Sequence, residues 1–164
     1  MATNQDVVAA LKTVVDGVSN IGQVHAYQRF NADWSTYLNS FKATISGTPQ
    51  IRGWIVTLEE NNPIVGGLEP PARFGSVARR YNALVIGVQG LKDSSNSEDD
   101  FLNLGEAVMD ALDAKKNLSV TGVVDYAVGP TTMRVFQIRQ FGSVTCHYCE
   151  IVCPVDVQKA VTQS

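Results

Sequence analysis

The sequence predicts an α+β domain in which a mostly antiparallel sheet of about five strands carries helices packed on one face. Two stretches of the chain repeat apolar residues at helical spacing, whereas alternating side chains dominate the rest. Short turns rich in glycine separate the last predicted strands, which suits antiparallel hairpins. The expected order of elements is therefore α-α-β-β-α-β-β-β.

Two helices are expected before the first strand. Residues 4–18 carry apolar side chains at helical spacing. Thr3 and Asp6 precede this stripe and match a capping box, in which each side chain accepts a hydrogen bond from the other residue's free amide. A second, shorter helix over 32–41 would place on one side Trp34, Leu38 and Phe41.

The middle of the sheet is expected to come from residues 50–60 and 79–91. Residues 50–60 alternate with apolar side chains on both faces, which is typical of a central strand. Between the two strands, residues 61–78 contain three prolines and three glycines. We expect a long loop there, of a length that is usually functional or mobile.

A third helix is expected within residues 94–116. Ser97 is a suitable N-cap, and Asp100 has the capping-box position. Acidic residues in the first turn and Lys115 and Lys116 near the end both have the sign that the helix dipole favours.

The last third of the chain predicts three strands, at 118–128, 132–141 and 144–157. Between the last two, Gly142–Ser143 suits a two-residue hairpin loop of type II′. We therefore expect a single domain over residues 1–164, with an extended C-terminal tail at 155–164.

The segment TCHYCEIVCP at 145–154 contains all three cysteines and is the strongest candidate for a metal or redox site. If this segment is a strand paired with 132–141, its side chains alternate between the two faces of the sheet. Cys146 and Cys149, the Cys-x-x-Cys pair, would then point to opposite faces. His147 and Cys153 would share a face, but about 20 Å of strand separates them, whereas zinc binds its ligands at about 2.0–2.3 Å. A loop that folds back is the alternative, but neither glycine nor proline occurs before Pro154. We expect small apolar strand residues at Cys146, Cys149 and Cys153.

Composition limits the other possibilities. Hydrophobic residues make up 45% and charged residues 18% of 164 residues, which allows one domain with a substantial core. The net charge of −3 argues against broad nucleic-acid binding. No apolar run reaches the ~18 residues of a membrane span, and the N-terminus lacks a basic region before its apolar stretch. We expect no membrane association and assembly in a reducing cytoplasm.

No catalytic constellation is evident from the sequence, and we expect a protein that is not an enzyme and binds no cofactor. The glycine pairs lack the spacing of a phosphate-binding loop. No nucleophile elbow surrounds Ser76, Ser94 or Ser97. A lone His25 is more often a hydrogen-bonded structural residue than a base.

Taken together, several segments resemble the tail terminator (tail-completion) proteins of long-tailed bacteriophages. The resemblance covers residues 21–155 and is carried by VHAYQRF, IRGWIVTLEE and RRYNALVIGVQGLKDSSNSEDDF, followed by a Gly-x hairpin and CHYCEIVCPV. It implies a structural virion protein of the tail neck, typically a hexameric ring that caps the tail tube and ends its polymerisation. The ring would join the tail tube protein to the head-tail connector, and genomic DNA would pass through its lumen without sequence-specific binding.

The resemblance also directs attention to the surfaces that would contact partners. We expect the sheet of 118–157 near the ring interior or a subunit interface, and the loop 61–78 at a neighbouring protein. Deletion of residues 64–72 is expected to leave the domain folded and to impair tail joining. The candidate interface residues are Ile64, Val65, Leu68, Arg73, Phe74, Arg79 and Arg80.

Two other classes of protein stay open at this point. One is a different neck component, such as a head-tail adaptor, which often follows the twelvefold symmetry of the portal. The other is a small zinc or thiol module built on the cysteine segment.

Overall fold

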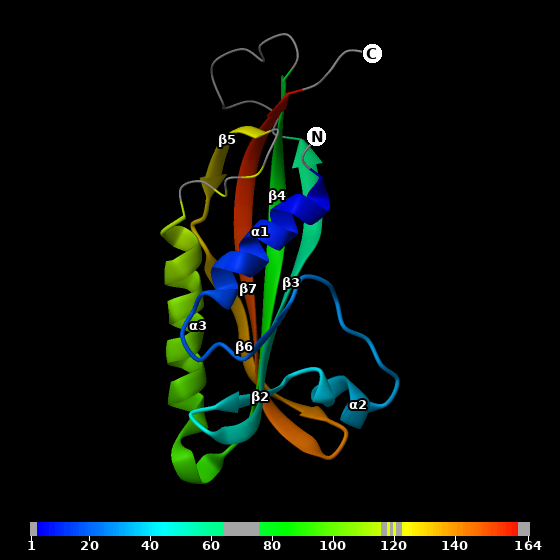
Figure 1. The fold of residues 1–164 in the computed structure, drawn as a ribbon, viewed down its shortest axis with the longest axis vertical. Helices are drawn as coiled ribbons and strands as arrows, with labels where there is room; N and C mark the ends of the chain where they lie inside the picture. The colour runs from blue at the N-terminus through cyan, green and yellow to red at the C-terminus, as the bar shows by residue number, and fades with distance from the viewer. Residues whose placement is uncertain (1–2, 64–75, 116–117, 119, 121–122, 161–164) are drawn as a thin grey trace.

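The computed structural model describes residues 3–63, 76–115, 118, 120 and 123–160. The elements of these residues follow in chain order (Figure 1). They are α1 (Asn4–Asp16), β1 (Gln23–His25), α2 (Trp34–Asn39), β2 (Lys42–Ile45), β3 (Thr48–Pro63), β4 (Ser76–Gly90), a 3-10 turn η1 (Asp93–Ser95), α3 (Ser97–Asp113), β5 (Val123–Val128), β6 (Thr132–Phe141) and β7 (Val144–Ala160).

The strands form an open, mostly antiparallel sheet, so the predicted α+β class is confirmed. The order is β1-β3-β4-β7-β5; β6 also pairs with β7, and β2 forms a hairpin with the start of β3. Only the pair β1–β3 is parallel among the described strands. The β4–β7 ladder runs without a register shift from Gly90–Cys146 to Ser76–Ala160 and forms the long axis of the molecule (Figure 1).

Two helices cover one face of this sheet, and the third lies on the other. α1 and α3 pack on Trp54, Val56 and Ile151 in the main core. Leu38 of α2 instead belongs to a second cluster with Val88 and Tyr148, whose side chains alternate to the opposite face. The expectation that all helices share one face is therefore wrong for α2.

A glycine explains how the chain around α2 approaches this opposite face. A Cβ atom on Gly53 would lie 2.5 Å from Cδ1 of Phe41, which follows α2 and is fully buried. Any larger residue would displace the phenyl ring, so Gly53 allows this helix and its flanking residues to pack on the sheet.

Several predicted boundaries hold and others shift. The Thr3–Asp6 capping box is present. The β6–β7 hairpin has its loop at Gly142–Ser143, with a positive φ of 62° at the glycine alone, as a type II′ turn requires. α3 begins one residue earlier than a Ser97 N-cap implies, because Asn96 is its N-cap and the Ser97 side chain has partners elsewhere.

The predicted loop 61–78 and tail 155–164 are too long. β3 continues to Pro63 and β4 begins at Ser76, with Pro63 paired to Arg79. The first residues of the predicted tail, 155–160, pair as the end of β7. Proline and polar residues suggested irregular structure, but proline is compatible with a strand end. No helix of the described residues is long and apolar enough to cross a membrane.

Candidate functional site

The cysteine segment lies in β7 and alternates as predicted. Cys149 and Cys153 are buried in the main core beneath α1 and α3, whereas Cys146 belongs to the cluster on the opposite face. All three are free thiols. The members of the Cys-x-x-Cys pair therefore point away from each other, and all three cysteines lie in one strand.

Burial also makes these thiols chemically inert. It raises the pKa of Cys146 to about 11 and the pKa of Cys149 and Cys153 to about 12. The thiolate is the nucleophilic and metal-binding form, and at neutral pH it is essentially unpopulated here. Within the described ranges, no group of three or more His, Cys, Asp or Glu side chains is placed to hold a metal ion.

His147 makes a contact that the sequence did not reveal. Its Nε2 lies 2.9 Å from Oγ of Ser97, and Ser97 Oγ accepts a hydrogen bond of 2.8 Å from the backbone N–H of Lys92. Ser97 and His147 therefore share a hydrogen bond, and the tautomer of the imidazole sets which of the two donates. Burial lowers the pKa of His147, although the charge of Glu98 opposes this. This direction favours the neutral imidazole in the folded protein.

This pair belongs to a buried polar row across the sheet. Arg52, Gln89 and His147 occupy matched positions on β3, β4 and β7, and all are buried. Gln89 donates to the carbonyl of Ser97 at 3.3 Å, and Arg52 donates to the carbonyl of Asn20 at 3.2 Å. Gln89 and His147 thus hold Ser97, the first residue of α3, on the sheet. A serine–histidine pair that is 95% or more buried has no access for a substrate.

Most of the predicted interface residues, namely Ile64, Val65, Leu68, Arg73 and Phe74, lie outside the described residues. Arg79 and Arg80 are exposed at the start of β4. Arg80 makes two hydrogen bonds of 2.6 and 2.7 Å with the Asp156 carboxylate on β7, which raise its pKa. Its guanidinium therefore has an intramolecular partner.

The face opposite α1 and α3 also carries a second group of ion pairs. Arg134 on β6 bridges Glu150 at 2.8 Å and Glu59 at 2.9 Å. The hydroxyl of Tyr148 donates to Glu150 at 2.6 Å, and this bond together with Arg134 lowers the pKa of that carboxyl. We call this surface, with Arg80, Arg134, Glu150 and Asp156, the ionic face.

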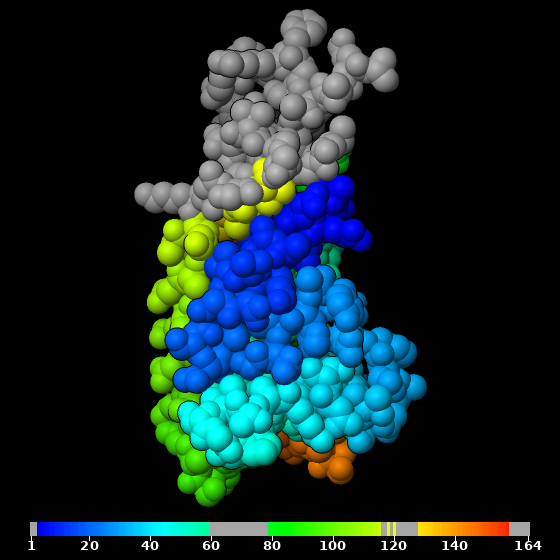
Figure 2. All heavy atoms as spheres, in the orientation of Figure 1, coloured from blue at the N-terminus to red at the C-terminus, as the bar shows by residue number. Residues whose placement is uncertain are grey.

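Aromatic side chains are exposed near α2. The aromatic loop, residues 26–33, carries Tyr27 at 56% and Phe30 at 90% exposure, and Trp34 follows at 48%. Arg29 donates to the Tyr27 hydroxyl at 2.6 Å and to Ser40 at 2.9 Å, which holds the loop against the end of α2. Figure 2 shows this light-blue region projecting from the body of the molecule. The sequence did not single out these residues as a group.

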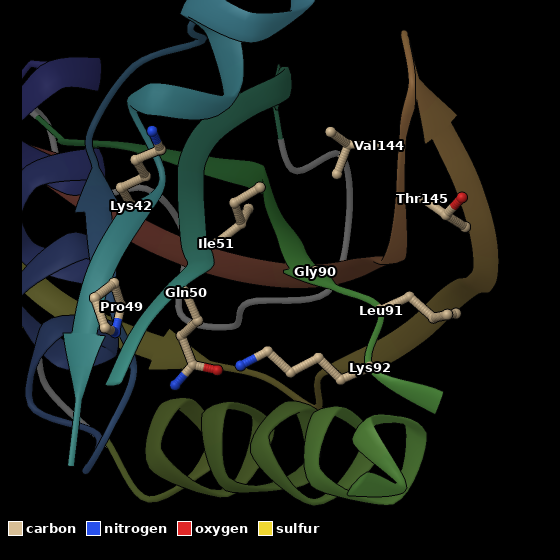
Figure 3. Close-up of a pocket in the computed structure, with 9 residues that line it drawn as sticks. All are labelled: Lys42, Pro49, Gln50, Ile51, Gly90, Leu91, Lys92, Val144 and Thr145. Carbon is tan, nitrogen blue, oxygen red and sulfur yellow. The ribbon is translucent and has the colours of Figure 1, made fainter. Parts of the chain in front are cut away.

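A pocket of about 320 Å³ lies where β2, β3, β4 and β7 meet (Figure 3). Ile51 and Val144 face it from two sides, and the Lys92 side chain extends toward Gln50. Among the described residues, no hydrogen bond or ion pair is found for the ammonium groups of Lys42 and Lys92. We call it the lysine pocket; its lining residues are Lys42, Pro49, Gln50, Ile51, Gly90, Leu91, Lys92, Val144 and Thr145.

Comparison with known proteins adds no assignment. No protein-family model matches the chain, and neither does any curated protein. The candidate sites are therefore defined by geometry alone. The cysteine strand is buried, whereas the ionic face, the aromatic loop and the lysine pocket lie at the surface.

Proposed function

We propose that this protein forms a ring, typically a hexamer, that caps the tail tube of a long-tailed bacteriophage. The ring ends tube polymerisation and joins the tail to the head-neck complex, and DNA passes through its lumen. It is a structural virion protein and not an enzyme.

One observation carries the proposal. The segments IRGWIVTLEE, RRYNALVIGVQGL and CHYCEIVCPV, on which the resemblance to tail terminators rests, occupy the neighbouring strands β3, β4 and β7. They therefore form one continuous structural unit at the centre of the sheet. A fortuitous resemblance of separate segments would not require them to be adjacent.

The distribution of chemistry supports an assembly role. The cysteines and the serine–histidine pair are buried, whereas charged and aromatic groups reach the surface. A ring needs heterologous contacts, in which two different surfaces of the same chain meet. The ionic face, the aromatic loop and the lysine pocket are distinct surfaces of this kind. The net charge of −3 suits a channel to which DNA must not adhere.

The test is tube capping in a reconstituted system. Purified protein is added to polymerising tail tube protein from the same phage, and tube lengths are measured by electron microscopy. We expect shorter tubes with extra density at one end, at ratios of one ring per tube. Unchanged tube lengths over a wide range of added protein would contradict the proposal. A twelvefold ring that binds the portal side alone would favour the adaptor class instead.

A further inference from the structure

Strand β6 lies at an edge of the sheet, and among the described strands none pairs with its outer side. A bulge between Met133 and Val135 interrupts the strand near its start, and the hairpin loop follows Phe141. The regular part of this edge is therefore residues 135–141, which we call the free edge. Ile138 lies at its midpoint and is 58% exposed.

The hairpin geometry determines which backbone groups of the free edge point away from β7. In a two-residue hairpin, the residues that flank the loop exchange both of their backbone hydrogen bonds, and every second pair along the ladder repeats this pattern. Phe141 is a flanking residue, so Gln140 and Ile138 belong to the intervening pairs, whose N–H and C=O groups face outward. The partner of Gln140 agrees with this assignment, because the Thr145 carbonyl points away from β6 and accepts a 3.0 Å bond from the Leu91 amide.

The free edge lacks the features that usually keep an edge strand from pairing with another chain. Proline, bulges and charged side chains commonly protect such edges. Residues 135–141 contain neither proline nor a bulge, and their single charged residue is Arg139. Its guanidinium lies 3.6 Å from the centre of the Tyr148 ring, so it covers a face of the sheet and not the edge. The edge can therefore accept a further strand.

We propose that the free edges of two copies pair with each other as antiparallel strands around a two-fold axis at Ile138. This pairing continues the antiparallel alternation of β3, β4, β7 and β6. Phe136 of one copy would lie opposite Gln140 of the other, and Ile138 would lie opposite itself. These outward-facing residues would exchange about six backbone hydrogen bonds.

The segment is complementary to itself, which identifies the added strand as a second copy. The two exposed isoleucines would cover each other from water at the axis. On the other face of the sheet, Gln137 would lie opposite Arg139 of the second copy, and an amide oxygen accepts hydrogen bonds from a guanidinium. No charge of the free edge therefore lies directly opposite a like charge. Val135 and Phe141, the two ends of the segment, are equally distant from Ile138, so the whole segment pairs in this register.

The contact goes beyond the proposed function and does not rest on it. Because it is isologous, it closes a dimer and cannot extend into a ring. We assign it to the protein outside the ring. Pairing of the two edges would also protect them from association with other chains before assembly.

Engineered cysteines test the contact directly, because the three native thiols are buried. Ile138→Cys is expected to form a disulfide-linked dimer in a thiol–disulfide buffer. The Cα atoms of an opposed, hydrogen-bonded pair are about 5.5 Å apart, which a disulfide can bridge. Gln140→Cys is the matched control, since its counterpart would lie about 13 Å further along the strand. Wild-type protein, treated identically, reports any reaction of the native thiols.

A mixture of two further variants tests the register. Gln137 and Arg139 of different copies would be opposed, with Cα atoms about 4.5 Å apart. Gln137→Cys mixed with Arg139→Cys is therefore expected to give dimers that contain one copy of each. Either variant alone should give little product, because like positions would be diagonal neighbours about 7–8 Å apart, beyond the reach of a disulfide.

The outcomes separate this inference from the proposed function. Equal dimer yields from Ile138→Cys and Gln140→Cys, or no dimer from Ile138→Cys at any concentration, would overturn the pairing. Rings in native mass spectrometry without a dimer from Ile138→Cys would overturn the pairing and leave the proposed function standing. A dimer linked at Ile138→Cys, from a protein that never shortens tail tubes, would support the pairing and contradict the proposed function.

A second measurement uses substitutions without cross-linking. Ile138→Lys is expected to weaken dimerisation by about tenfold, because two like charges would be directly opposed. Thr132→Lys, at an exposed residue of β6 before the bulge, is the matched control and should leave dimerisation unchanged. Sedimentation velocity measures the dissociation constant, and urea denaturation verifies that both variants fold. Equal constants for the wild type and both variants would contradict the pairing, as would a wild type that is monomeric at every concentration.

Discussion

The sheet face beneath α1 and α3 differs sharply from the face opposite. The covered face is a continuous apolar core that includes Cys149, Ile151 and Cys153. The buried polar row of β3, β4 and β7 lies at one end of this core, beside the start of α3. The opposite face carries ion pairs along β6 and β7 and an aromatic cluster around α2. Because side chains alternate, every central strand contributes to both faces. The comparison indicates that the covered face stabilises the domain, whereas the proposed function assigns partner contacts to the other surfaces.

The largest effect is expected where the covered face is broken. Phe101 on α3 is fully buried, with its ring centre 5.8 Å from that of Trp54. Phe101→Ala is expected to lower the free energy of unfolding by about 3–5 kcal/mol, because the cavity cannot refill in a packed core. Urea denaturation measures this loss in the free energy of unfolding. Phe30→Ala removes the same ring from an exposed site and should change stability by less than about 0.5 kcal/mol. Similar losses in both variants would refute the contrast.

The cysteine strand provides a smaller test of the same face. Cys149→Ser places a hydroxyl group in apolar surroundings and is expected to cost about 1–3 kcal/mol, unless the hydroxyl finds a hydrogen-bond acceptor. Cys149→Ala is the control for lost volume. Thermal unfolding with and without a chelator completes the measurement, since neither the variants nor the wild type should respond to chelation. A chelator-dependent drop in Tm for the wild type alone would instead indicate a metal site.

A pH dependence is expected from His147. Burial lowers its pKa, so the unfolded chain, which protonates near its ordinary pKa of about 6.5, binds more protons than the folded protein. The free energy of unfolding should therefore fall as the pH drops through about 6.5 toward the lower pKa of the folded state. The contribution of one proton is at most about 1.4 kcal/mol per pH unit.

His147→Gln isolates that contribution. Between pH 7.5 and about 5, its free energy of unfolding should change less steeply than that of the wild type, whatever its absolute stability. Identical slopes in urea titrations at matched pH values would show that the buried imidazole does not control the acid sensitivity.

The smallest effect is expected on the ionic face. Arg134 bridges Glu59 and Glu150, but its side chain is 43% exposed and solvent screens the interaction. Arg134→Gln should lower Tm only slightly, and about 1 M salt should abolish the difference. Arg79→Gln, at an exposed arginine of β4, is the matched control. A large, salt-independent loss for Arg134→Gln would mean that this face is also part of the stabilising core.

The parts of this fold that the sequence predicts are those with a long, regular pattern. Alternation and a tight turn determine the register of β6 with β7, and hence the opposed directions of Cys146 and Cys149. Alternation likewise predicts that β3 is a central strand with apolar side chains on both of its faces. β1 and β2 are only three and four residues long, too short to show a period, and they form because a neighbouring strand offers free hydrogen bonds.

The surfaces were harder to predict than the core. Ser97 and His147 are 50 residues apart, and their contact depends on how α3 packs against β7. Considered with its sequence neighbours alone, Ser97 is a suitable N-cap. In the folded protein its side chain instead contacts His147, and Asn96 is the N-cap. Likewise, the lysine pocket joins residues of four strands, and the exposure of Phe30 depends on the path of the loop before α2. Neither follows from spacing along the chain.

Native mass spectrometry of the purified protein tests the central claim of a ring-forming, metal-free structural protein most directly. We expect masses at sixfold multiples of 17.8 kDa, with no added metal mass, at concentrations where the ring is assembled. One zinc ion per chain would contradict the account of the cysteine strand. A twelvefold assembly would contradict the terminator and favour an adaptor.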